Sequence, residues 1–144
     1  MDKFKIMKIC IIDGQGGGIG SAVIKRLKER FDEKIEVIAL GTNAIATAQM
    51  LKARANKGAS GSNAIVQTVK MADVIIGPVG IIMPHAMMGE VTPEMAEAVC
   101  LSRARKVLLP LTQENISIAG LTGLPLPQLV DELIDIHLLF LNKE

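Results

Sequence analysis

One stretch decides the fold of this chain: Asp13-Gly14-Gln15-Gly16-Gly17-Gly18-Ile19-Gly20-Ser21. It places five glycines in seven positions, directly after the largely apolar run Ile6–Ile12. A strand, a glycine loop and a helix N-terminus in that order let backbone N–H groups approach a ligand and set a phosphate against the helix dipole. The stretch therefore predicts a site for a nucleotide or another phosphate-bearing ligand. The alternative is a tight strand-to-helix turn that binds nothing.

The spacing of the glycines distinguishes between the known phosphate loops. No Lys follows a glycine in this chain, so the Walker A pattern does not fit. The strict G-x-G-x-x-G pattern also fails, because a motif that begins at Gly14 and Gly16 ends on Ile19. The pattern that fits is G-x-x-x-G-x-G at Gly14, Gly18 and Gly20.

The loop is similar to two known phosphate-binding loops. Gly18-Ile19-Gly20 resembles the fingerprint of short-chain dehydrogenases, and residues 16–21 resemble the loop of tubulin-like GTPases. The resemblance implies NAD(P) or another nucleotide as the cofactor. It covers only about the first third of the chain for the dehydrogenases and only the loop for the GTPases. The dehydrogenases' catalytic Tyr-x-x-x-Lys pair has no counterpart, because the sequence contains no tyrosine.

Composition limits the class of protein. A length of 144 residues with 49% apolar residues predicts one domain with a sizeable core. Together with the glycine loop, this gives a single Rossmann-like nucleotide-binding domain over residues 1–144. The net charge is +1 and only three residues are aromatic, so we expect no nucleic-acid partner. Cys10 and Cys100 lie far apart in apolar surroundings, which predicts neither a disulfide nor a metal site. With neither a signal-peptide pattern nor a long apolar span, we expect a cytoplasmic protein without membrane contact.

Strand-like and helix-like segments alternate along the chain. This pattern predicts an α/β fold of the three-layer, Rossmann-like kind, with a mainly parallel sheet of four to five strands. Strands are expected at 5–13, 35–40, 74–76 and 106–111, with a short fifth strand at 115–119, and the stretch 57–63 is expected to be a loop. Helices are expected at 18–31, 44–55, 64–71, 92–103 and from 126 onward.

Ligands of open α/β sheets bind outside the carboxyl ends of the strands. Polar residues and glycines gather at four such ends, which should converge on one rim of the sheet. The predicted cofactor-binding residues are Gly14, Gln15, Gly16, Gly17, Gly18, Ile19, Gly20, Thr42, Asn43, Gly77, Pro78, Gly80 and Thr112.

Two positions on this rim have alternative interpretations. Asp13 either holds a cation at a phosphate or, as we prefer, accepts N–H bonds from the glycine turn. A dinucleotide fold usually places an acid at the end of the second strand for the ribose hydroxyls, but Thr42 and Asn43 stand there. Either residue could bind a ribose or a 2′-phosphate, and Asn43 could equally cap the next helix.

Candidate catalytic residues are few. Asp13, His85 and Glu114 are the titratable residues near the expected rim. His85 lies among Met and Ile residues, which suggests a mobile lid or a subunit contact at the mouth of the site. Glu114 is otherwise a solvated loop carboxylate. His85 has no nearby Cys, Asp or second His at metal-ligand spacing, so no metal site is expected.

The last helix predicts a subunit interface. Residues 136–141 read Ile-His-Leu-Leu-Phe-Leu, which is apolar on nearly every face. A helix apolar on all sides is buried, here either against another chain or across the sheet. We therefore expect a homodimer through the C-terminal helix.

Over nearly its whole length the chain resembles a family of small, uncharacterised bacterial proteins, a domain-of-unknown-function family. The resemblance implies no activity, and three functions stay open. They are a nucleotide sensor or accessory subunit, a small enzyme acting on a phosphorylated metabolite, and a structural oligomer without a ligand. The segments that carry the resemblance are Ile9–Ser21, Ala39–Thr47, Gly58–Asn63, Gly77–Glu90 and Leu108–Asn115.

Overall fold

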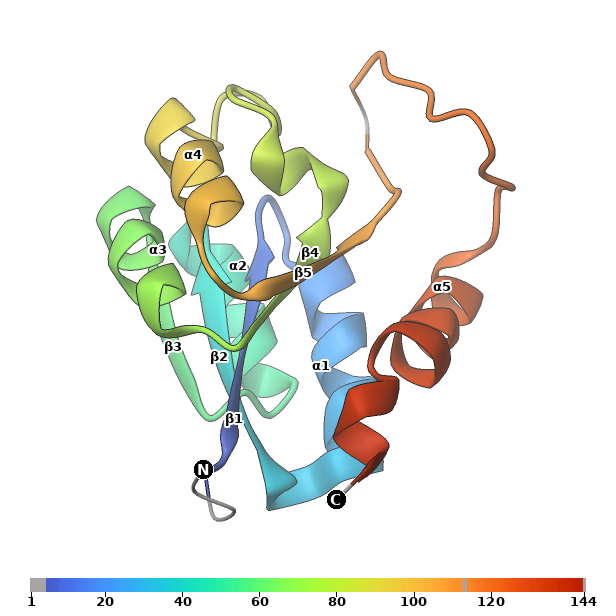
Figure 1. Ribbon diagram of the computed structural model, residues 1–144. Helices are drawn as coiled ribbons and strands as arrows, with labels where there is room; N and C mark the ends of the chain where they lie inside the picture. The colour runs from blue at the N-terminus through green and yellow to red at the C-terminus, as the bar shows by residue number, and fades with distance from the viewer. Residues whose placement is uncertain (1–4, 113, 144) are drawn as a thin grey trace.

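The computed structural model describes residues 5–112 and 114–143 and has an α/β architecture (Figure 1). Its parallel five-stranded sheet has the order β3-β2-β1-β4-β5, so the strand order reverses between β1 and β4. The predicted Rossmann-like fold class is confirmed. The strands are β1 (Met7–Asp13), β2 (Ile35–Gly41), β3 (Lys57–Ser60), β4 (Val74–Pro78) and β5 (Arg105–Leu109).

Helices cover both faces of the sheet and make three layers (Figure 1). One face packs on α1, α2 and α5, and the other packs on α3 and α4. Because side chains alternate along a strand, Ile9 and Ile11 of β1 join the first core while Cys10 and Ile12 join the second. The helices are α1 (Gly18–Phe31), α2 (Ala44–Lys52), α3 (Ser62–Thr68), α4 (Pro93–Leu101) and α5 (Leu126–Glu132).

The helix that follows the glycine loop shows why these elements form. Val23, Leu27 and Phe31 of α1 are buried on one stripe, as their spacing predicts, whereas Lys25 and Glu29 are exposed. The register then places the strand ends together, because Asp13 pairs with Gly41. None of the helices in the described residues is long and apolar enough to span a bilayer.

Two strand predictions are wrong. Residues 57–60 are not a loop but the edge strand β3, which pairs with β2 from Ile38 to Gly41. Its sequence Lys-Gly-Ala-Ser carries no apolar alternation, so the free edge of β2 determines this strand rather than its own side chains. Residues 115–119 form no strand and belong to a segment that arches away from the sheet after β5 (Figure 1). β5 ends at Leu109, directly before Pro110, which has no N–H to continue a ladder.

The C-terminal segment packs largely on its own chain. After α5 the chain continues as a wider helical turn, η4 (Leu133–His137), and a tighter one, η5 (Leu139–Lys143). Leu138 is 0% exposed and lies in the core beside α1, so its own chain, the second of the two expected covers, buries it. Ile136 and Leu139 remain 57% and 54% exposed.

Candidate functional site

Asp13 joins the end of β1 to the start of α1. Its Oδ1 accepts the amide of Gly14 at 2.8 Å and its Oδ2 accepts the amide of Gly20 at 2.7 Å. Burial raises the pKa of Asp13, while the amides of Gly20 and Gly14 act in the opposite direction. Both oxygens therefore bond the glycine turn, which is the turn-capping role preferred from the sequence.

The glycines of the loop divide into two kinds. A Cβ on Gly17 would lie 2.8 Å from the backbone of Ala46, and a Cβ on Gly20 would lie 2.5 Å from the sulfur of Met50. These positions are glycine because helices pack against them, and Gly17 also has a left-handed φ of 75°. Gly16 and Gly18 are exposed, and a Cβ on either would meet nothing within 4 Å.

The backbone amides of Gly16 and Gly18 also differ from those of the neighbouring loop residues. Within the described residues, neither N–H donates to a protein acceptor, whereas the amides of Gly14, Gln15, Gly17 and Gly20 all do. These two exposed donors lie at the N-terminus of α1, where the helix dipole favours a negative charge. The loop therefore offers two backbone donors to a ligand that approaches from solvent.

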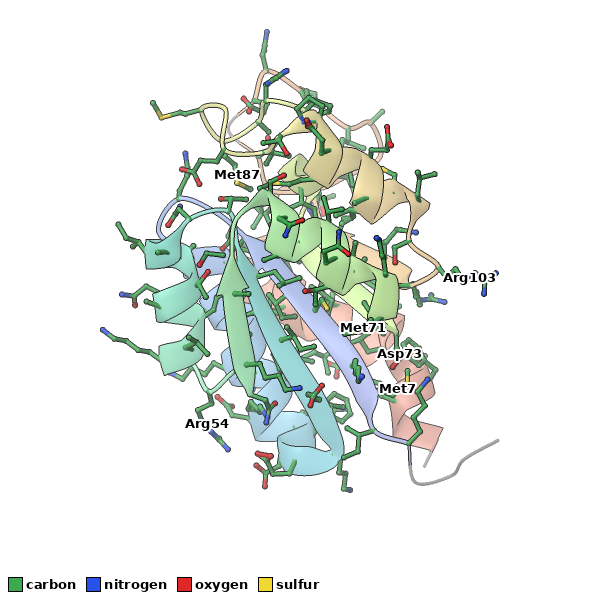
Figure 2. All side chains as sticks on the ribbon, turned by 90° about the vertical axis from the view of Figure 1, so that its left-hand side faces the viewer. Met7, Arg54, Met71, Asp73, Met87 and Arg103 are labelled. Carbon is green, nitrogen blue, oxygen red and sulfur yellow. The ribbon has the colours of Figure 1, made fainter. Side chains whose placement is uncertain are left out.

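The segment 83–91, between β4 and α4, covers Gly14. A Cβ on Gly14 would lie 2.6 Å from the sulfur of Met87 and 2.9 Å from Oε1 of Glu90. Figure 2 shows Met87 beyond the carboxyl ends of the strands. Three non-glycine residues in this segment, His85, Met87 and Met88, have left-handed φ angles of 71°, 58° and 57°. Such angles cost free energy and are frequent at ligand-binding sites.

Glu90 reaches the end of β2 from this segment. Its Oε1 accepts three hydrogen bonds: from the amide of Gln15 at 2.9 Å, the hydroxyl of Thr42 at 2.6 Å and the side-chain amide of Asn43 at 2.8 Å. Desolvation raises the pKa of Glu90, but the donors outweigh it, and the pKa lies below its ordinary value. Glu90 could not be identified from the sequence, because no spacing rule relates it to Thr42, 48 positions away.

A cavity of about 470 Å³ lies beside the glycine loop, at the ends of β1, β4 and β5. Its wall carries two carboxylates, of Asp13 and Glu114, and no Lys or Arg among the residues that the structure describes. Most of the remaining wall is apolar. The lining residues are Asp13, Gln15, Ile19, Pro78, Gly80, Ala86, Met87, Met88, Leu111, Thr112 and Glu114.

The other residues predicted for the site have varied positions. Asn43 caps α2, since its Oδ1 accepts the amide of Ala46 at 2.8 Å, and it also contacts Glu90. Thr112 lies on the cavity wall, where its hydroxyl accepts the amide of Glu114 at 3.0 Å. Gly77 is not among the described residues that line the cavity, and a Cβ there would meet the backbone of Ile12 on the neighbouring strand.

The candidate acids and bases are mostly engaged by the backbone. Glu114 Oε1 accepts the amide of Met87 at 3.0 Å, so it holds the 83–91 segment in place. His85 lines a separate, smaller hollow of about 320 Å³ and lies outside the main cavity. In the part of the chain that the structure describes, no three His, Cys, Asp or Glu residues are grouped as metal ligands.

Comparison with known proteins adds the family. No curated protein matches the sequence. Residues 8–142 match a family described as a domain of unknown function, DUF3842. This match covers nearly all of the chain, from the second residue of β1 through α5. The family resemblance inferred from the sequence is thus confirmed, and the chain belongs to the DUF3842 family.

Proposed function

We propose that this chain binds a nucleotide or dinucleotide of the NAD(P) kind at its glycine-rich loop, as a cytoplasmic sensor or accessory subunit. The observation that carries the proposal is the contrast among the loop glycines. Gly17 and Gly20 are packed against α2, but Gly16 and Gly18 face open space with amides that have no protein acceptor among the described residues. Packing within the chain gives no reason for glycine at those two positions, whereas the close approach of a phosphate does.

The sheet topology supports a dinucleotide in particular. The glycine loop lies where the strand order reverses between β1 and β4, which is where open α/β sheets bind their ligands. A phosphate at Gly16 and Gly18 would have the 470 Å³ cavity on its β4 side and the end of β2 on the other. The largely apolar cavity, without Lys or Arg, suits an uncharged ring or a cation better than a second phosphate.

The geometry of the titratable groups favours binding over turnover. The oxygens of Asp13 bond two loop amides, Glu114 bonds the amide of Met87, and His85 lies outside the cavity. Each candidate acid or base thus has a structural partner or the wrong position for general acid–base chemistry. A small enzyme acting on a phosphorylated metabolite has less support than a sensor.

Thermal unfolding with a panel of ligands tests the proposal. The panel is NAD, NADP, FAD, ATP, GTP and inorganic phosphate, since a ligand that binds only the native state raises its stability. We expect at least one nucleotide to raise the Tm of the wild-type protein, and Gly18→Val to abolish that rise. The matched control is Gly123→Val, because Gly123 is also exposed with open space around it but lies in the arch after β5. Equal binding by the Gly18→Val protein would mean that the loop is only a turn.

We also propose that the chain forms a homodimer through apolar side chains left exposed near its C-terminus. Ile136 and Leu139 support this proposal, together with exposed Leu121 and Leu124 in the arch that precedes α5. Apolar groups exposed in one region of a small protein are a common feature of subunit contacts.

A further inference from the structure

Besides Asp13, a second acidic group lies where the glycine loop meets the end of β2. It is the carboxylate of Glu90, which the 83–91 segment carries across Gly14. β2 itself ends in Gly41 and is followed by Thr42 and Asn43, so it supplies no acid of its own. The fold therefore places Glu90, from a segment distant in sequence, at the end of β2, which has no acidic residue of its own.

Thr42 and Asn43 have their polar groups occupied by this arrangement. The hydroxyl of Thr42 and the amide of Asn43 both donate to Oε1 of Glu90, and the Asn43 oxygen caps α2. Neither side chain is left to bind a phosphate on the ligand. Their contacts instead hold Glu90 in one orientation.

The second oxygen of Glu90 is available. All three hydrogen bonds to the carboxylate end on Oε1, and within the described residues Oε2 accepts none. Glu90 also forms no ion pair among those residues, so its charge is not neutralised by a Lys or Arg. An ionised carboxylate with a free oxygen accepts hydrogen bonds from hydroxyl groups and repels phosphates.

We propose that Glu90 binds the ribose hydroxyls of the nucleotide, with Thr42 and Asn43 as the residues that position it. In dinucleotide-binding folds the ribose lies beside the end of the second strand, and an acid there accepts its 2′-hydroxyl. Here the acid comes from the connection between β4 and α4. The ligand therefore has a ribose with a free 2′-hydroxyl, as in NAD or ATP, and not a 2′-phosphate as in NADP. This inference rests on the proposed function.

The strained backbone of the 83–91 segment fits the same role. Met87 and Met88 keep left-handed angles while Glu114 holds the amide of Met87 and Val91 accepts the amide of His85 at 2.7 Å. These bonds fix the backbone on both sides of the turn that presents Glu90. Strain of this kind persists where the surrounding contacts determine one conformation.

Paired ligands test the inference on the wild-type protein without any variant. NAD and NADP differ by one 2′-phosphate, and ATP and dATP differ by the 2′-hydroxyl alone. By isothermal titration calorimetry we expect the hydroxyl-bearing member to bind about tenfold or more tightly in at least one pair, because hydrogen bonds to charged groups are strong. Equal or tighter binding of NADP and of dATP would overturn the inference.

Variants then assign the preference to Glu90. We expect Glu90→Gln to weaken the preferred ligand about tenfold and to bring the two members of its pair close to equal affinity. Thr42→Val should reduce the same preference by a smaller factor. Glu94→Gln is the matched control, since Glu94 is an exposed acid in the first turn of α4 and should change neither affinity.

The outcomes separate the two proposals. If no nucleotide in the panel binds the wild-type protein, both the proposed function and this inference fail. If a nucleotide binds through Gly18 but its affinity ratio is the same in the Glu90→Gln protein, only the inference fails. Tighter binding by the Glu90→Gln protein would mean that the carboxylate blocks the site instead of recognising the ribose.

Discussion

Asp13 and Gly20 are joined by a hydrogen bond of 2.7 Å from the amide of Gly20 to Oδ2 of Asp13, across the whole glycine loop. The end of β1 and the first turn of α1 are thus held by one buried carboxylate, which is only 4% exposed. The conformation of the glycine loop and the start of α1 therefore both depend on the side chain of Asp13.

We expect Asp13→Asn to lower the free energy of unfolding by about 1–3 kcal/mol, because one of the two amides then faces an NH₂ group instead of an acceptor. Chemical denaturation measures the change. Asp32→Asn is the control, since Asp32 is exposed and its carboxylate, among the described residues, contacts Arg54 in a surface ion pair. A loss no larger than that of the control would mean that the loop keeps its shape without the carboxylate.

As pH rises through the acidic range, the contribution of Asp13 to the free energy of unfolding should fall, whereas that of Glu90 should rise. The folded pKa of Asp13 is raised above its ordinary 3.8, so in that interval the folded state binds more protons than the unfolded state. The contribution of Asp13 to stability therefore falls as pH rises from 3.8 through the raised pKa. The pKa of Glu90 is below its ordinary 4.5, so its contribution is present above pH 4.5 and is lost as pH falls through the lowered value.

Denaturation of Asp13→Asn and Glu90→Gln between pH 3 and pH 7 measures these two slopes against wild type. The stability gap between wild type and Asp13→Asn should shrink as pH rises. The gap between wild type and Glu90→Gln should grow over the acidic part of the same range. Slopes of the same sign for both variants would contradict the assignment.

Gly20 and Gly18 offer a matched pair of substitutions in one helix turn. A Cβ on Gly20 would lie 2.5 Å from the Met50 sulfur and 3.0 Å from Cβ of Asp13. We therefore expect Gly20→Ala to cost about 1–3 kcal/mol of stability through overpacking. Gly18→Ala should change stability by less than about 0.5 kcal/mol, because its Cβ enters open space. Similar losses for both variants would argue against the packing role of Gly20.

Replacing Met88 with glycine should stabilise the protein. Its φ is 57° and its side chain is 96% exposed, so glycine removes backbone strain and loses almost no packing. We expect Met88→Gly to raise the free energy of unfolding by about 0.5–1 kcal/mol. Met71→Gly is the control, because Met71 is 58% exposed in a helical turn without a positive φ, and it should destabilise. A loss of stability in the Met88→Gly protein would show that the segment is not strained in solution.

Two substitutions in the C-terminal segment distinguish a side chain that stabilises the core from one that forms a subunit contact. Leu138→Ala should cost about 2–5 kcal/mol, because Leu138 is buried within its own chain. Ile136→Glu should leave the fold intact, since Ile136 is exposed, and should convert a dimer into monomer in light scattering. A wild-type chain that is already monomeric at micromolar concentration would contradict the proposed dimer.

Much of the fold could be predicted from the sequence, because its main elements carry strong local signals. α1 begins at Gly18 and ends at Phe31, as its apolar stripe predicts, and β2 begins at Ile35. β3 could not be predicted, since Lys57–Ser60 forms a strand only because β2 has a free edge. The stretch 115–119, expected to be a short strand, forms none, and its two apolar side chains Ile116 and Ile118 are exposed.

The candidate site could be predicted only where it follows the chain locally. Strand ends identified Asp13, Thr42 and Thr112, because parallel strands bring their carboxyl ends to one rim. Glu90 and Met87 were not found, since their position depends on how the 83–91 segment crosses the glycine loop. The left-handed angles of that segment fall on His and Met residues, which do not signal such a turn in a sequence.

The central position of β1 has a consequence for synthesis on the ribosome. β1 pairs with β2 on one edge and with β4, from Val74 onward, on the other, and β4 is synthesised well after β2. At translation rates of about 5–20 residues per second, the interval between residues 41 and 78 lasts on the order of 2–7 s. During it, a nascent chain has an apolar strand with an unpaired edge, which is a template for association with neighbouring chains. Variants that slow the synthesis of β4 should therefore reduce soluble yield even where the finished protein is fully stable.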